Sequence, residues 1–144
     1  MQIELHTRRP FRALEEDVGA WRVLRLTGEV DAGTSGLLPT LVVYAMRRGA
    51  VKVCLDLTEL ERVDRSGAAA LRRCTRAARY AGGRLAMIAP DDPGVAEVLE
   101  DSGVNREVPE LGRREEMFAR THRPRRRESE PAGATRPRRR SGAR

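Results

Sequence analysis

Val63-Asp64-Arg65-Ser66-Gly67 forms the predicted turn between a strand and a helix in the most regular part of this sequence. Before the turn, residues 51–57 alternate as a β-strand does, and after it the apolar side chains of residues 68–81 recur at helical spacing. A helix N-terminus has backbone N–H groups without intrahelical partners and a partial positive charge, so a partner can recognise what lies there. We therefore expect this turn to be exposed and the protein to act by being bound at it.

Apolar periodicity predicts further elements on both sides of the turn. In strand 51–57, Lys52 and Asp56 point away from the apolar side chains, and a strand buried on both faces seldom carries two charges. We therefore expect an α/β fold with a small mixed, mostly parallel sheet and helices mainly on one face. The predicted strands are 2–7, 21–27, 51–57, 84–89 and 106–108, with 10–19 as a polar connection, and the predicted helices cover about 36–48, 68–81, 93–102 and 111–118.

Charge divides the chain into two parts. Residues 113–144 contain 12 of the 28 basic residues and 4 of the 21 acidic ones, a net charge of +8, so residues 1–112 carry −1. We predict one domain at 1–112, followed over 113–144 by a short helix and a basic disordered tail. Such a tail is either a solvated extension or a weak electrostatic contact for nucleic acid or membrane phosphate. From residue 120 onward it has no aromatic residue to stack on bases.

Sequence motifs for catalysis, metal binding and membrane insertion are missing. There is no P-loop, GxSxG or HExxH, and His6 and His122 lie far apart in the sequence. Cys54 and Cys74 form no CxxC and have no neighbouring His, so we expect buried free thiols. No signal peptide and no run of 18 apolar residues is present. These features predict a cytoplasmic protein that is not an enzyme, with no cofactor, metal or small-molecule substrate.

Four short motifs occur in order along the chain: LTGEVD at 26–31, LDL at 55–57 with VDRSG at 63–67, GGRL at 82–85 and VLEDSGV at 98–104. Together they resemble a STAS domain of the SpoIIAA-like anti-sigma factor antagonist family, over residues 1–112. The resemblance implies a small α/β domain without a cofactor that regulates transcription by partner switching. In that process it binds an anti-sigma factor with a serine-kinase fold and frees the sigma factor.

The turn departs from the family pattern at Arg65. In the family, the kinase phosphorylates a Ser or Thr directly after the Asp of the turn, and the phosphate abolishes binding. Arginine has no hydroxyl and carries the opposite charge, so it neither accepts nor mimics this modification. Ser66 matches the second hydroxyl position of the family turn. It either caps the helix that starts at Ala68 or replaces the missing phosphoacceptor.

The predicted partner-binding residues surround this turn. Arg65 is either an ordinary solvated side chain or, because a cation near a helix N-terminus is mildly unfavourable, one that pairs with a partner carboxylate. Asp64 caps the helix or orients the turn, and the resemblance implies that it also helps recognition. The alternative function is a STAS module of a stress-signalling or lipid-transport complex, whose basic tail contacts phosphate-rich surfaces. The full predicted set is Glu29, Asp31, Asp64, Arg65, Ser66 and Gly67, of which Glu29 and Asp31 resemble the family's partner-facing loop.

Overall fold

One five-stranded sheet organises residues 10–112, the part of the chain that the computed structural model describes. β1 pairs with β2 in antiparallel fashion, whereas β2 pairs with β3 and β4, and β3 with β5, in parallel. The predicted fold class, α/β with a small mixed, mostly parallel sheet, is therefore confirmed. The strands are β1 (Arg12–Val18), β2 (Trp21–Val30), β3 (Lys52–Asp56), β4 (Leu60–Val63) and β5 (Arg84–Ile88).

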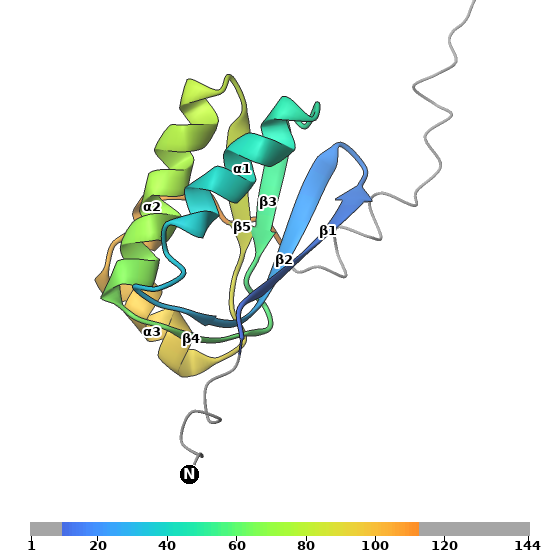
Figure 1. The fold of residues 1–144 in the computed structure, drawn as a ribbon. Coiled ribbons are helices and arrows are strands. Elements are labelled where there is room, and N and C mark those ends of the chain that lie inside the picture. Colours follow the sequence, from blue (N-terminus) through green and yellow to red (C-terminus); the bar gives the residue numbers. More distant parts are fainter. Residues whose placement is uncertain (1–9, 113–144) are drawn as a thin grey trace, which may run out of the picture.

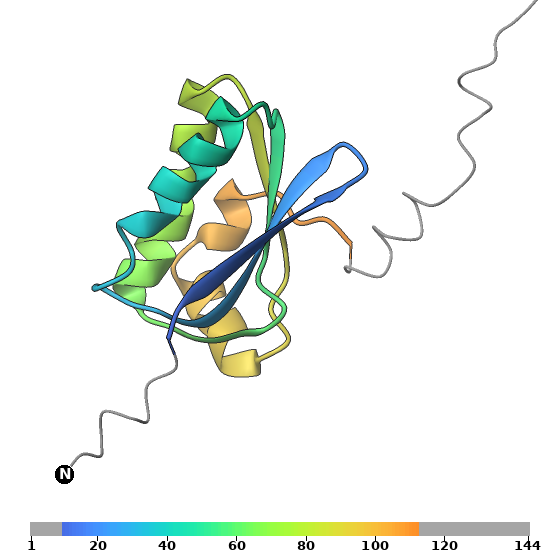
Figure 2. The same cartoon turned by 45° about the vertical axis from the view of Figure 1, so that its right-hand side comes forward.

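The helices of the described residues pack against one face of the sheet, as predicted, although Cys54 and Asp56 on the other face of β3 are buried too. Figure 1 shows α1 beside α2, and Figure 2 shows the helical layer on one side of the strands. None of the helices within residues 10–112 has the length and apolar character needed to cross a membrane. The helices are α1 (Leu37–Arg47), α2 (Arg65–Tyr80), α3 (Pro93–Asp101) and α4 (Val104–Glu107).

The core between sheet and helices is aliphatic. Leu26, Leu55 and Leu71 are at most 1% exposed and belong to one large cluster. A smaller cluster on the other face of the sheet contains Cys54. Asp56 is also fully buried, and its Oδ1 atom accepts a hydrogen bond from the backbone N–H of Thr58 at 3.0 Å. Cys54 and Cys74 are free and buried, as predicted, and burial raises the pKa of both thiols to about 12.

The hairpin at the start of the described residues differs from the prediction. Residues 12–18 form β1 and not a polar connection, and a two-residue turn with Gly19 at φ 64° leads into β2. The error has a physical cause: Glu15, Glu16 and Asp17 give β1 the look of a loop, but β1 is an edge strand. Arg22 of β2 pairs with two of these acids, Nε to Asp17 at 2.6 Å and Nη1 to Glu15 at 3.1 Å. The predicted strand 2–7 lies outside the described residues.

The end of the domain also differs from the prediction. The expected edge strand at 106–108 is wrong, because residues 104–107 form α4 after Gly103 adopts a left-handed conformation (φ 82°). The chain returns to the sheet slightly later, where Glu110 bridges Met87 in parallel and the backbone N–H of Leu111 donates to the carbonyl of Met87 at 2.8 Å. The predicted domain end at 112 and the tail of 113–144 remain predictions, since residues from 113 onward are not described.

Glu15 joins the hairpin to the C-terminal end of α1, and we expect its contribution to stability to depend on pH. A hydrogen bond from Arg48, followed by one from Arg22, lowers the pKa of Glu15. A carboxyl group whose pKa is lowered in the folded state stabilises the fold at pH values above the pKa that the group has in the unfolded chain. That stabilisation is lost as the pH falls through the folded pKa. The Glu15 side chain is 33% exposed, so solvent screening reduces the effect.

Glu15→Gln is therefore expected to lower the free energy of unfolding by about 0.5 to 1 kcal/mol at neutral pH. In acid, where Glu15 is protonated, the difference from wild type should disappear. Urea unfolding over a descending pH series measures both values. Glu59→Gln, which removes an exposed carboxylate outside this ion-pair cluster, is the control. A difference that persists unchanged into acid would contradict the prediction.

Candidate functional site

The ends of β2 and β4 bring the predicted partner-binding residues to one edge of the sheet. β4 runs parallel to the last residues of β2, which places Glu29 opposite Arg62 and Val30 opposite Val63. The backbone N–H of Asp64 then donates to the carbonyl of Val30 at 3.2 Å. The turn at 63–67 therefore lies directly beside the loop that follows β2. We call the group formed by Glu29, Asp31, Asp64, Arg65 and Ser66 the turn surface.

Asp64 is the N-cap of α2. Its Oδ1 accepts a hydrogen bond from the backbone N–H of Gly67 at 2.8 Å, and α2 begins at Arg65. This corrects the expectation that Ser66 caps a helix starting at Ala68. Ser66 is already in the first turn of α2, and Asp64, Arg65 and Ser66 are all exposed. One acidic, one basic and one hydroxyl side chain are therefore presented to solvent at the start of the helix.

Gly67 lies beneath the turn and is buried. A Cβ atom at this position would come within 2.4 Å of the carbonyl oxygen of Val30 and 2.8 Å of Cγ2 of Val63. The missing side chain thus allows α2 to approach the end of β2 closely. In this structure Gly67 sets the position of the turn surface and offers no side chain to a partner.

The loop after β2 is held by its own side chains. Oδ1 of Asp31 accepts hydrogen bonds from the backbone N–H groups of Gly33 at 3.0 Å and Thr34 at 3.2 Å. The hydroxyl of Thr34 accepts from the backbone N–H of Asp31 at 2.9 Å. Reciprocal bonds of this kind fix a loop that would otherwise be mobile. Asp31 therefore shapes the turn surface through its own hydrogen bonds to the loop.

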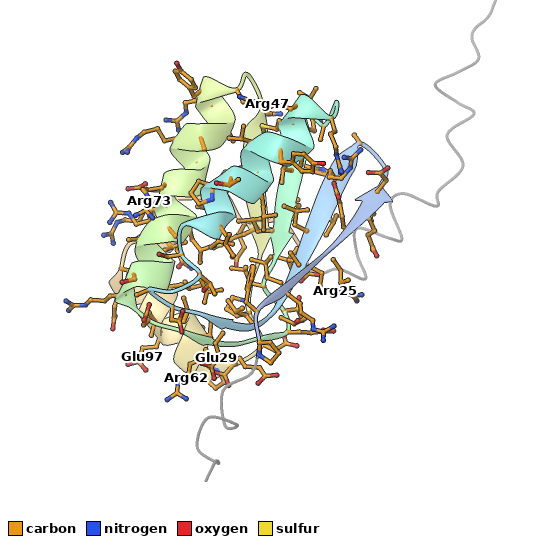
Figure 3. All side chains as sticks on the ribbon, viewed as in Figure 1. Arg25, Glu29, Arg47, Arg62, Arg73 and Glu97 are labelled. Atoms are coloured by element: carbon orange, nitrogen blue, oxygen red, sulfur yellow. The ribbon has the colours of Figure 1, made fainter. Side chains whose placement is uncertain are left out.

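Sequence reasoning missed Arg62, which the structure places next to the turn surface. Figure 3 shows Glu29 and Arg62 at the same end of the molecule, together with Glu97 of α3. Arg62 was missed because β4 is short and is buried only at Leu60 and Val63, a spacing that does not alternate. The parallel pairing of β4 with β2 is the feature that brings Arg62 opposite Glu29.

The turn surface can form ion pairs and hydrogen bonds with another molecule. It presents carboxylates, a guanidinium and a hydroxyl from two segments of the chain. Within residues 10–112, no group of three His, Cys, Asp or Glu side chains could hold a metal ion. The two thiols of the chain are buried and have raised pKa values. Recognition of a partner is therefore the chemistry that this surface supports best.

Removing the cap of α2 is expected to destabilise the fold. Asp64→Ala leaves the backbone N–H of Gly67 without its side-chain acceptor and should lower the free energy of unfolding by about 1 kcal/mol. Ser66→Ala is the matched control, because Ser66 does not cap the helix and its loss should change stability by less than about 0.5 kcal/mol. Urea unfolding of both variants measures the difference. A larger loss for Ser66→Ala than for Asp64→Ala would contradict this assignment of the cap.

Known proteins resemble this chain in sequence family and in fold. A family model described as "Mlab, STAS domain" matches residues 15–112. The solved structure of the anti-sigma factor antagonist SpoIIAA in its unphosphorylated form is 23% identical, with a TM-score of 0.59, and the match covers 77% of this chain and 95% of that one. An anti-sigma factor antagonist from Mycobacterium paratuberculosis is 16% identical, with a TM-score of 0.64 and coverages of 79% and 96%.

A much longer membrane protein also contains a similar fold. The murine Solute Carrier 26 family member A9 anion transporter is 13% identical, with a TM-score of 0.55, and the match covers 77% of this chain but 22% of the transporter. No curated protein matches this chain by sequence. At these identities, the solved structures establish the fold that residues 10–112 share with them.

Proposed function

This chain belongs to the STAS domain family, and on that premise we propose that it is a binding module of the anti-sigma factor antagonist kind. In this proposal it binds an anti-sigma factor with a serine-kinase fold and thereby frees a sigma factor. It regulates transcription by partner switching, without catalysis. Two observations support the proposal. One is the fold that it shares with two anti-sigma factor antagonists, and the other is the charged turn surface, where Asp64, Arg65 and Ser66 are exposed.

The position of Arg65 is the observation that carries this function. Arg65 is the first residue of α2 and is exposed, at the helix end where the macrodipole disfavours a cation. Asp64 uses its Oδ1 atom in the helix cap. Within residues 10–112, no carboxylate forms an ion pair with Arg65. An acidic group of a partner would give this guanidinium the counter-charge that the helix end does not supply.

The same residue removes the usual switch. A kinase that binds the turn surface meets a guanidinium at the position where the family carries a hydroxyl, and it has no oxygen there to phosphorylate. We therefore propose that the chain binds its partner without being released by phosphorylation at residue 65. Ser66 is exposed and does not cap the helix, so it is the one hydroxyl within residues 63–67 that could replace the acceptor.

The test mixes the full chain with serine-kinase-fold anti-sigma factors encoded in the same genome, in the presence of Mg²⁺ and ATP. We expect a complex on size-exclusion chromatography that persists during incubation, and an intact mass without added phosphate. Arg65→Ser should restore the switch: this variant should gain one phosphate and then leave the complex. Ser66→Ala is the control for modification at the neighbouring residue.

Three outcomes would contradict the proposal in different ways. If no anti-sigma factor of this class binds, the partner assignment fails. If the wild-type chain is phosphorylated at Ser66 and released, the partner assignment is correct but the proposed loss of the phosphorylation switch is wrong. If Arg65→Ser binds as wild type does and is never modified, the turn is not presented to the kinase active site.

A second candidate function is a STAS module of a stress-signalling or lipid-transport complex. The likeness to part of the murine anion transporter favours it, because a comparable fold there forms a minor share of a membrane protein. In this case the basic residues of 113–144 would contact phosphate-rich surfaces. Deleting residues 120–144 separates the two functions. Unchanged binding of the domain to its protein partner, together with lost affinity for anionic vesicles or DNA, would favour the second.

A further inference from the structure

A basic cleft of about 270 Å³ lies between α2 and α4, away from the turn surface. Figure 2 shows the short helix α4, in orange, beside α2, and an ion pair between Arg72 and Glu107 joins the two helices. Arg72 is seven residues beyond Arg65, which is about 10 Å along the helix axis. A ligand in the cleft would therefore leave the turn surface accessible. The cleft is lined by Arg72, Thr75, Arg76, Arg79, Arg106 and Glu107.

Positive charge exceeds negative charge in the cleft by three. Glu107 is the only carboxylate of its lining and accepts from Nε of Arg72 at 3.2 Å and from Nη2 at 2.9 Å. The hydrogen bond from Arg72, with the charges of Arg76 and Arg106, lowers the pKa of Glu107, which keeps it ionised and paired. Arg76, Arg79 and Arg106 form no ion pair with another side chain of residues 10–112.

Thr75 supplies a second, independent observation. Its Oγ1 atom is buried and has no hydrogen-bond partner among residues 10–112. Buried hydroxyl groups almost always have a partner, and a threonine within a helix ordinarily bonds to the carbonyl four residues earlier. Thr75 makes neither kind of bond, yet it lines a cleft surrounded by guanidinium groups. The Thr75 side chain as a whole is only half-buried, so the second χ1 rotamer open to threonine in a helix would turn this hydroxyl toward a ligand oxygen in the cleft.

The spacing of these residues places their donors on one side of α2. Counted from Arg72, the positions of Thr75, Arg76 and Arg79 are three, four and seven residues further along α2. This is the spacing of neighbours on one helix face. α2 contains no acidic residue that could neutralise them. Arg72 gives Nε and Nη2 to Glu107 but keeps Nη1 for another acceptor. Several guanidinium groups and one hydroxyl thus converge from two helices.

We propose that this cleft binds a phosphomonoester group. A phosphate dianion offers the oxygen acceptors and the double negative charge that several arginines and a hydroxyl can bind together. Two sources share this chemistry: free phosphate or a small phosphorylated molecule, and the headgroup of phosphatidic acid in a membrane. All residues that line the site lie within 10–112. It stands or fails independently of the proposed anti-sigma factor partner.

The first arm of the test is an NMR titration of the isotope-labelled full chain with inorganic phosphate and with pyrophosphate at constant ionic strength. Backbone amides of Thr75, Arg76 and Arg106 report the cleft separately from the arginines after residue 112. We expect saturable shifts at these amides. Affinity should fall by at least about tenfold in Arg76→Gln and Arg106→Gln, because each removes a charge-assisted hydrogen bond.

Two further variants keep the result interpretable. Thr75→Val should weaken phosphate binding by about tenfold, while its melting temperature stays at or above that of wild type, because the buried hydroxyl has no partner to lose. Arg73→Gln is the matched control: it lies on α2, removes the same charge and is not part of the cleft, and Figure 3 shows it on the outer side of α2. Its phosphate affinity should change by less than about twofold.

The second arm measures binding to phosphatidylcholine vesicles with and without phosphatidic acid. If the protein responds to phosphate but not to the vesicles, the ligand of the cleft is a soluble phosphate compound. If the protein binds phosphatidic acid vesicles and Arg76→Gln weakens that binding, the ligand is the lipid headgroup. Both results support the cleft as the site. No saturable response to either probe, or an equal loss in Arg73→Gln and Arg76→Gln, would overturn the proposal, since the second result describes general attraction to a basic surface.

Discussion

Gly67→Ala is expected to lower the free energy of unfolding by about 2 kcal/mol, although alanine is the better helix former. The new Cβ would lie 2.4 Å from the carbonyl oxygen of Val30 and 2.9 Å from its Cγ1 atom. Overpacking of this kind costs up to about 3 kcal/mol, while exchanging glycine for alanine in a helix returns about 1 kcal/mol. The clash prevails because its nearest atom belongs to the backbone and cannot move away alone.

The same substitution should also disturb the turn surface. To relieve the contact, α2 must move away from the end of β2, and this movement shifts Asp64 and Arg65 relative to Glu29. Urea unfolding measures the loss of stability. Gly36→Ala is the control: no atom lies within 4 Å of its added Cβ and φ is −68°, so its stability should stay within about 0.5 kcal/mol of wild type. A Gly67→Ala variant as stable as wild type would show that α2 does not pack this closely on β2.

The centre of this fold could be predicted because local pattern and burial agree there. In α2, Leu71, Cys74 and Ala78 recur at helical spacing, and each is at most 1% exposed. The alternation of residues 51–57 likewise corresponds to β3, and Asp92-Pro93 correctly predicts the start of α3, with Asp92 as its N-cap. In α2 and α3 the pattern agrees with burial, whereas in β3 Cys54 and Asp56, on the face that the charges predicted to be open, are buried as well.

The edges of the fold could not be predicted, because interactions between distant segments decide them. β1 is acidic and exposed, and it becomes a strand because β2 supplies its hydrogen bonds and Arg22 its counter-charge. The predicted strand at 106–108 placed Arg106 and Glu107 at a sheet edge. Only the structure shows that α4 brings them to α2, so the basic cleft could not be expected from the sequence.

The candidate site was predictable in its position but not in its internal roles. The sequence brings Asp64, Arg65 and Ser66 to the start of a helix, and the structure exposes all three there. Asp64 and Ser66 are both good capping residues, two positions apart, and the residue that caps depends on where the helix begins. That point is set by the contact of Gly67 with Val30, a feature of tertiary packing. Whether these residues bind a partner stays a prediction.

Arg65→Glu is expected to weaken binding of the anti-sigma factor by about a hundredfold while stabilising the domain by several tenths of a kcal/mol. On the proposed function, Arg65 meets a carboxylate of the partner, and charge reversal turns this attraction into repulsion within the interface. In the free protein the same substitution is stabilising, because an acidic residue in the first turn of α2 interacts favourably with the helix macrodipole. Lost binding therefore cannot be attributed to a weakened fold.

Titration calorimetry with the anti-sigma factor and urea unfolding measure these two effects on the same preparations. Arg73→Glu is the matched control, since it makes the same charge change on an exposed position of the same helix, about 12 Å along the axis from Arg65. It should alter binding by less than about fivefold, because rim charges act weakly and are screened by salt. If Arg65→Glu and Arg73→Glu weaken binding equally, the partner responds to the overall charge of α2. The turn would then not be the point of contact.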